Sequence, residues 1–143
     1  MIKLTEIRDS AVGVIAALYP DKTIYDERQQ QGMNFPCFFV QIIPVYTRRY
    51  RPESNRDRTL LSIKYFTDSE STLECLEVKE KLDTVLSKTL NVSGNVLSIQ
   101  SVEIDVKKET VGNSLDYMIT LDYFNAIEEE EIYLPMDDVQ IDF

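Results

Sequence analysis

Histidine and tryptophan are absent from this chain of 143 residues, which has only two cysteines and four glycines. Without histidine there is no Ser-His-Asp triad, no Cys-His nucleophile pair and no histidine-ligated metal site. Two cysteines are too few for a four-cysteine zinc site. The glycines are scattered, and none forms a phosphate-cradling loop. These absences remove the common catalytic and cofactor sites, so we expect neither an enzyme nor a bound cofactor or metal.

Long apolar segments are also missing from the sequence. No apolar run is long enough to cross a bilayer, and the first eight residues lack the basic stretch and apolar segment of a signal peptide. We therefore expect the protein in the cytoplasm of the cell that makes it. Cys37 and Cys75 have apolar neighbours and fall in different expected elements, which predicts two buried free thiols.

The acidic side chains are concentrated at the C-terminal end. The formal net charge is −10, from 25 acids and 15 bases, and seven of the acids lie in residues 128–143, which contain no base. Residues 1–127 therefore hold 18 acids against 15 bases. The phosphate backbone repels an acidic protein, so sequence-specific binding of nucleic acid is not expected. The charge pattern predicts one domain at residues 1–127 followed by an acidic C-terminal arm at residues 128–143.

Hydrophobic periodicity predicts two helices and five strands. The helices are expected at residues 4–18 and 71–90, and the strands at residues 23–25, 35–46, 58–66, 97–107 and 115–123. The order α-β-β-β-α-β-β predicts an α+β fold, in which two helices flank a mixed, mainly antiparallel β-sheet. Ser71 and Glu74 match a capping box at the start of the second helix.

Two irregularities are expected in the strands. Pro44 has no backbone donor, so this end of its strand should lie at a sheet edge or a bulge. Leu97 and Ile99 have the opposite parity to Val102 and Ile104, and a bulge at residues 100–101 would reconcile the two halves of that strand.

Arginines gather in one segment of an otherwise acidic protein. Residues 47–57 have the composition of a long polar hairpin connection. Guanidinium groups pair with carboxylates and phosphates, so this segment is a candidate assembly contact. Tyr46 and Tyr50 could stack on bases if the target were nucleic acid. The alternative, which the residues leave open, is a solvated hairpin tip. The candidate contact residues are Arg48, Arg49, Arg51, Arg56 and Arg58.

Apolar side chains are interspersed among the acids of the C-terminal arm. Val139, Ile141 and Phe143 alternate with polar residues, which is the period of a strand with one apolar face. Such a strand needs a partner, and we expect it to add to an open sheet edge of another subunit. The alternative is a tail that only keeps the subunit soluble. The candidate contact residues of the arm are Tyr133, Leu134, Met136, Val139, Ile141 and Phe143.

Six short stretches form a pattern: residues 24–27 (IYDE), 36–40 (PCFFV), 61–66 (LSIKYF), 74–78 (ECLEV), 115–118 (LDYM) and 122–124 (DYF). Together with the arginine-bearing segment, they resemble a family of tail terminator proteins from phages and phage-tail-like particles of Gram-positive bacteria. The resemblance extends from residue 1 to about residue 126. The arm that follows is longer and more acidic than the family pattern.

The resemblance implies a structural protein of virion assembly, with a mixed sheet flanked by helices. Such proteins close into a ring, expected to be a homohexamer, on the end of a finished tail tube. The ring ends tube growth and forms the head-proximal interface. The candidate arginines would line the lumen of the ring, where DNA passes, or meet acids of a neighbouring subunit. The implied partners are other copies of the chain, the tail tube protein, and the tail sheath or head connector. The protein would pass from the host bacterial cytoplasm into the tail of a virion or tailocin, with no membrane partner.

Other functions are compatible with the same residues. A head–tail connector or completion protein would also form a ring and lack catalytic groups. A nucleic-acid-binding module would use residues 48–58, and its affinity would fall steeply as salt rises. A small carboxylate enzyme is disfavoured, because histidine and glycine-rich motifs are missing.

Overall fold

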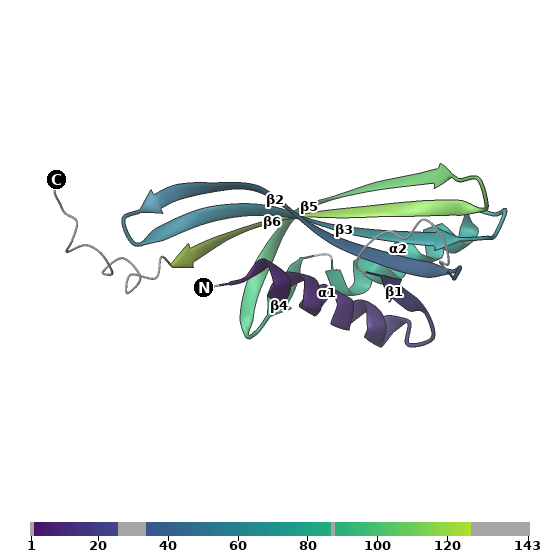
Figure 1. The fold of residues 1–143 in the computed structure, drawn as a ribbon, viewed down its shortest axis with the longest axis horizontal. Coiled ribbons are helices and arrows are strands. Elements are labelled where there is room, and N and C mark those ends of the chain that lie inside the picture. The colour runs from purple at the N-terminus through teal and green to yellow at the C-terminus, as the bar shows by residue number, and fades with distance from the viewer. Residues whose placement is uncertain (1, 26–33, 87, 127–143) are drawn as a thin grey trace, which may run out of the picture.

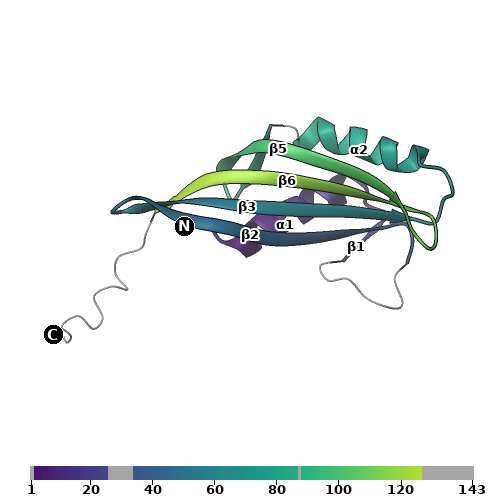
Figure 2. The ribbon, with the colours of Figure 1, turned by 90° about the horizontal axis from the view of Figure 1, so that it is seen from above.

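The computed structural model describes residues 2–25, 34–86 and 88–126, which form a curled β-sheet with its helices on one face (Figures 1 and 2). In chain order the elements are α1 (Leu4–Leu18), β1 (Thr23–Tyr25), β2 (Cys37–Arg51), β3 (Ser54–Thr67), α2 (Leu73–Leu86), β4 (Thr89–Val92), β5 (Asn95–Lys108) and β6 (Asn113–Ala126). The strand order across the sheet is β1-β2-β3-β6-β5-β4, and only the β1–β2 pair is parallel. The expected α+β class is confirmed. The C-terminal arm at residues 128–143 lies outside the described residues.

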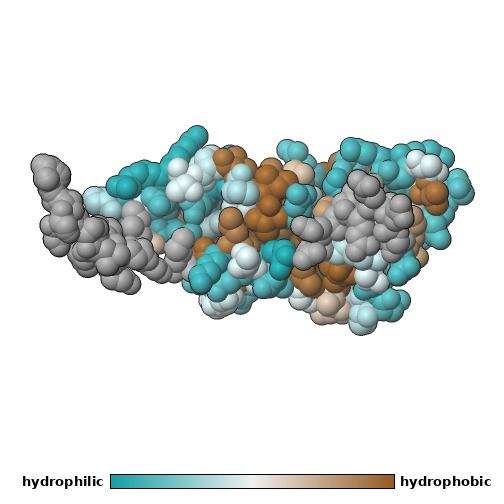
Figure 3. Space-filling view, in the orientation of Figure 1, coloured by the Kyte–Doolittle hydropathy of each residue, from teal (hydrophilic) through white to brown (hydrophobic). Residues whose placement is uncertain are grey.

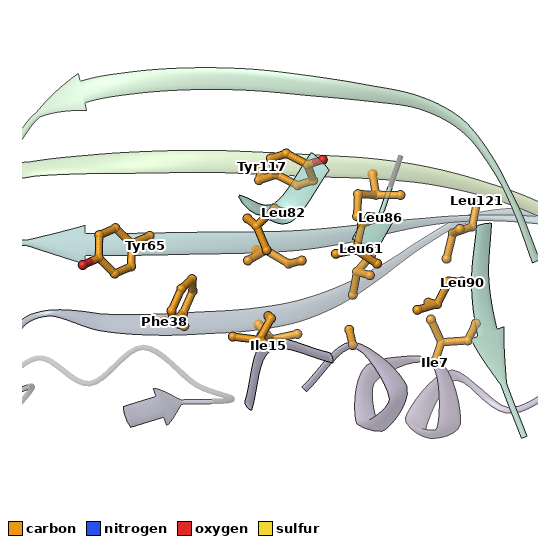
Figure 4. Close-up of a cluster of buried hydrophobic side chains, with 14 of the residues drawn as sticks. Ile7, Ile15, Phe38, Leu61, Tyr65, Leu82, Leu86, Leu90, Tyr117 and Leu121 are labelled. Atoms are coloured by element: carbon orange, nitrogen blue, oxygen red, sulfur yellow. The ribbon is translucent and has the colours of Figure 1, made fainter. Parts of the chain in front are cut away.

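The hydrophobic core lies between the helices and the near face of the sheet (Figure 4). Ile7, Ala11 and Ile15 recur every four residues on α1 and are fully buried, as the helical period predicts. Cys37 and Cys75 are buried free thiols, which confirms that prediction. The strands contribute alternate residues to this core: Phe38, Val40, Leu61, Ile63, Tyr65, Leu115, Tyr117, Ile119 and Leu121.

Two tyrosines attach α2 to the sheet. The Tyr65 hydroxyl donates a hydrogen bond to the Glu74 carboxylate, and the Tyr117 hydroxyl donates to Asp83 at 2.6 Å. The expected capping box is therefore only half correct. The Ser71 hydroxyl accepts the Leu73 backbone N–H at 3.1 Å, but Glu74 is engaged by a sheet tyrosine. Burial of both rings, with their hydroxyls paired, fixes the position of the helix over β3 and β6.

The expected second helix is too long, because it ends at Leu86 and the chain then forms β4. Leu90 and Val92 are buried and alternate with exposed residues, which is the period of a strand. A tight turn at Ser93 (φ 51°) and Gly94 (φ 86°) joins β4 to β5. The sheet therefore has one strand more than the sequence predicts.

Both expected strand irregularities are confirmed. The register between β5 and β6 shifts between Ile99 and Ser101, so the bulge lies at Gln100. This bulge bends β5, and β4 comes to lie beside α1 (Figure 1). The β2–β3 register shifts directly after Pro44, and among the described residues β1 pairs with β2 only as far as Phe39. Pro44 therefore lies at a bulge and, in the part of the chain that the structure describes, at a sheet edge without a partner strand.

The expected polar connection at residues 47–57 is wrong. β2 continues to Arg51 and β3 begins at Ser54, so only two residues connect the strands. The physical reason is a third strand: β6 pairs with β3 along the whole segment, up to the Ser54–Ala126 pair. Backbone hydrogen bonding across three strands keeps this polar segment in strand conformation, although its side chains show no hydrophobic pattern that would predict a strand. The result is a hairpin that projects beyond the helices (Figures 1 and 2).

Candidate functional site: an arginine-rich hairpin

The projecting hairpin brings the five candidate arginines together, although they are separated along two strands. The register places Tyr46 opposite Arg58 and Arg58 opposite Asp122. One step further toward the tip, Arg48 lies opposite Arg56. Tyr46, Arg48, Arg56, Arg58 and Asp122 share the face of the sheet that carries no helix, which is turned to the viewer in Figure 2. Arg49 pairs with Asn55 and lies on the opposite face. Hydrophilic residues predominate at this end of the molecule (Figure 3).

Two of the arginines are held by one carboxylate on β6. Arg58 binds Asp122 bidentately, with Nε–Oδ1 and Nη2–Oδ2 distances of 2.7 Å. Arg56 Nη2 donates to Asp122 Oδ2 at 3.0 Å. The Asp122 side chain is only 6% exposed, and its hydrogen bond with Arg58 is the largest cause of a pKa below the usual value. Arg56 and Arg58 therefore brace the hairpin against β6.

The tyrosines of the hairpin stack on arginines of the same chain. The Arg48 guanidinium carbon lies 3.9 Å from the centroid of the Tyr46 ring, and that of Arg58 lies 5.4 Å from the same centroid. Arg51 lies 5.0 Å from the Tyr50 ring centroid. Such cation–π contacts orient the guanidinium groups and leave their N–H donors accessible. Tyr46 and Tyr50 thus stack within the hairpin in this structure.

A candidate contact surface remains at the end of the hairpin. Within residues 2–25, 34–86 and 88–126, no carboxylate forms an ion pair with Arg48, Arg49 or Arg51. Beside them the Tyr50 and Phe124 rings pack at a centroid distance of 4.7 Å, and the two residues remain 52% and 56% exposed. Binding hot spots are enriched in aromatic residues and arginine, and both are exposed side by side here. We use the name hairpin tip for five residues: Arg48, Arg49, Tyr50, Arg51 and Phe124.

Phe124 is the residue of this surface that the sequence analysis missed. It lies on β6, more than 70 positions after Tyr50, and reaches the hairpin tip only through the pairing of β6 with β3. A signal was present in the sequence, because Phe124 falls on the polar parity of its strand, with Asp116 and Asp122. An apolar residue on the solvent-facing side of an alternating strand indicates a binding surface.

Metal ligands and membrane-spanning helices are two further features that could define a site. No group of three or more cysteines and carboxylates in the described part of the chain is placed to hold a metal ion. Neither α1 nor α2 is long and apolar enough to span a membrane.

The Asp122 contacts predict a pH-dependent contribution to stability. Because the pKa of Asp122 is lowered on folding, its charged form adds stability above the ordinary value of 3.8, and this is lost as the pH falls through the folded-state pKa. Asp122→Asn should lower the free energy of unfolding by about 1 kcal/mol near neutral pH, since the arginines are partly exposed. Urea unfolding should show the difference in stability between the two proteins shrinking as the pH falls below 3.8. A gap that persists at low pH would contradict this.

The geometry defines a class of protein: an α+β domain with one sheet, whose most distinctive surface is a projecting basic hairpin. The chain belongs to the phage tail terminator protein family, whose model matches residues 6–133. It is thus a structural protein of the phage tail. A comparison with curated proteins found no match. One solved structure superposes with a TM-score of 0.54 at 10% identity, covering 83% of this chain and 89% of the other, which shows a shared fold.

Proposed function

We propose that the protein closes into a homohexameric ring on the end of a finished tail tube, ends tube growth and forms the head-proximal interface. The observation that carries this proposal is the match to the tail terminator family over residues 6–133. The projecting hairpin supports it, because a subunit that works only by contact needs exposed, preorganised side chains. The Asp122 pairing and the cation–π stacks supply that preorganisation.

The position of the protein in the tail tests the proposal. Gold-labelled antibodies against a short tag, placed on purified tails, should mark one end of each tail and no other site. The mass of the detached cap should be about six times that of the 16.6 kDa chain if the ring is a hexamer. Label distributed along the tail would refute the terminator function. Label at the head–tail junction of particles whose tail length does not depend on this protein would favour the connector alternative.

The acidic arm is proposed as a second contact. The described structure offers an open edge of the kind it needs, because β5 pairs with β4 only as far as Ser98 and leaves its later residues unpaired on that side. Val102 and Ile104 of this edge lie on the helix-facing side of the sheet and are partly exposed. Strand addition to such an edge combines backbone hydrogen bonds with pockets for alternate side chains.

Deletion of residues 132–143 tests the role of the arm. We expect the shortened protein to keep the melting temperature of the full chain but to cap at least about tenfold fewer tails, because the added strand is missing. Tail counts by electron microscopy give the measurement. In a control protein, residues 128–131 are replaced by glutamine. This control keeps the alternating apolar residues of the arm and removes the charge of the four glutamates, so it shows which of the two features capping requires. Equal capping by the shortened and full-length proteins would remove the arm from assembly.

Binding of nucleic acid by the hairpin tip is the alternative with a specific feature in its favour, since three guanidinium groups lack a described carboxylate partner. A phosphate-binding site must lose affinity steeply as salt rises. Titration of a labelled DNA duplex with the purified protein, from about 50 to 200 mM salt, should show no binding if the tip is a protein contact. Tight, salt-sensitive binding would favour the alternative.

A further inference from the structure

The first turns of α2 carry an exposed surface that the core does not use. Leu73 and Leu76 are 59% and 48% exposed, although both are large apolar residues. Glu77 and Glu80 lie one turn further on, and the spacings of three and four residues put all four side chains on one patch of the helix. We call these four residues the acidic helix face.

The carboxylates of this patch are unpaired within the described residues. Lys79, which lies between them in sequence, forms its ion pair with Asp83 at 2.6 Å, and Glu74 is engaged by Tyr65. No lysine or arginine of the described chain forms an ion pair with Glu77 or Glu80. Both glutamates also line a groove of about 690 Å³ between α2 and Tyr19, whose lining includes Lys22 and Lys81. The groove gives the patch a concave border.

The acidic helix face and the hairpin tip are complementary in chemistry and lie at opposite ends of the molecule (Figures 1 and 2). The acidic helix face has two exposed leucines and two carboxylates, which form no ion pair with a described cation. The hairpin tip has two exposed aromatic rings and three arginines, which form no ion pair with a described carboxylate. Because the two surfaces lie on opposite ends of one chain, they cannot meet within a subunit. They can meet only between copies, head to tail.

We propose that the hairpin tip of one subunit docks on the acidic helix face of a second copy. The aromatic rings pack on Leu73 and Leu76, while the arginines bind Glu77 and Glu80. The contact is heterologous, so each subunit uses one surface on each neighbour, and repetition by a closing rotation gives a ring. This inference rests on the proposed ring, and it goes further by naming both sides of the subunit interface.

Charge reversal tests the pairing in cells that make the particle and lack their own copy of the gene. One variant carries Arg49→Glu and Arg51→Glu, and the other carries Glu77→Arg and Glu80→Arg. Each alone places like charges together at every interface and should reduce normal-length tails at least about tenfold. The two expressed together should restore them, because rings in which the variants alternate contain only opposite charges at each contact. A control with Lys88→Glu and Lys108→Glu should behave as wild type.

A cross-link provides a measurement that does not depend on rescue. Tyr50→Cys combined with Leu76→Cys should give a ladder of disulfide-linked oligomers when assembled tails are oxidised, whereas either single variant should give none. The native cysteines do not interfere, because both are buried. Melting curves of the purified variants show whether each one folds, and the cross-link decides the question if a charge-reversed protein does not.

The outcomes separate the interface from the function. If wild-type protein supplied in these cells fails to set tail length, the proposed function is wrong. If wild type succeeds but the mixed variants fail while folded, or if no ladder forms, the tip does not dock on α2 and the terminator function stands. Normal tails from either charge-reversed variant alone would also overturn the inference.

Discussion

Tails assembled with a protein in which Arg48, Arg49 and Arg51 are all alanine are expected to be irregular in length and unable to join heads. The three side chains have no carboxylate partner among the described residues, so their charge is available to a partner in the tail. Arg48 and Arg51 stack on Tyr46 and Tyr50, and the loss of both contacts should cost about 1–2 kcal/mol of folding stability. We expect the subunit to fold and normal-length tails to fall at least about tenfold.

A matched control separates the site from the net charge. Lys88, Lys107 and Lys108 are exposed and belong to β5 or to the segment before β4, outside the hairpin, so replacing all three by alanine removes the same charge. That protein should assemble tails as wild type does. Electron microscopy gives the tail lengths, and thermal unfolding of both purified triple variants shows whether they are folded. Normal, head-joined tails from the arginine variant would show that the hairpin tip makes no required contact.

Gly112→Ala is expected to be the most damaging single change to folding. Gly112 lies in the turn between β5 and β6 with φ +74°, where other residues are strained. A Cβ there would lie 1.8 Å from the Thr67 backbone oxygen and 2.7 Å from Asp68 Cα. Because these atoms belong to backbone, the clash cannot be relieved by a rotamer change. Strain and overpacking together should lower the free energy of unfolding by about 3 kcal/mol or more.

Two other glycines serve as controls for that measurement. Gly94 also has a positive φ (+86°), but a Cβ added there would meet no other atom within 4 Å, so alanine should cost only the backbone strain, about 1 kcal/mol. Gly13 lies in α1 with open space around it, so alanine should stabilise the protein by up to about 1 kcal/mol. Urea unfolding of all three variants should give this order. Equal stability of Gly112→Ala and Gly94→Ala would show that the Thr67 contact relaxes.

Elements whose signal lies in neighbouring residues were determined by the sequence alone. The spacing of Ile7, Ala11 and Ile15 defines the buried side of α1, and the parity change around Gln100 defines the bulge in β5. The exposed hairpin residues were also recognised as a group, because arginines are conspicuous in an acidic chain. For the helix and the bulge the physical cause is local, because the helical or strand period decides which side chains face the core.

Tertiary structure decided the rest, because the deciding partners are distant in sequence. Residues 47–57 have the composition of a loop, but they form strands because β6 lies beside β3 and pairs with its polar segment. Asp122 reaches Arg58 across 64 positions, and this contact makes Arg56 and Arg58 braces while Arg48, Arg49 and Arg51 remain at the tip. Phe124 joins Tyr50 in the same way. The sequence therefore determined which residues carry the charge, and the pairing of distant strands decided which of them are available to bind.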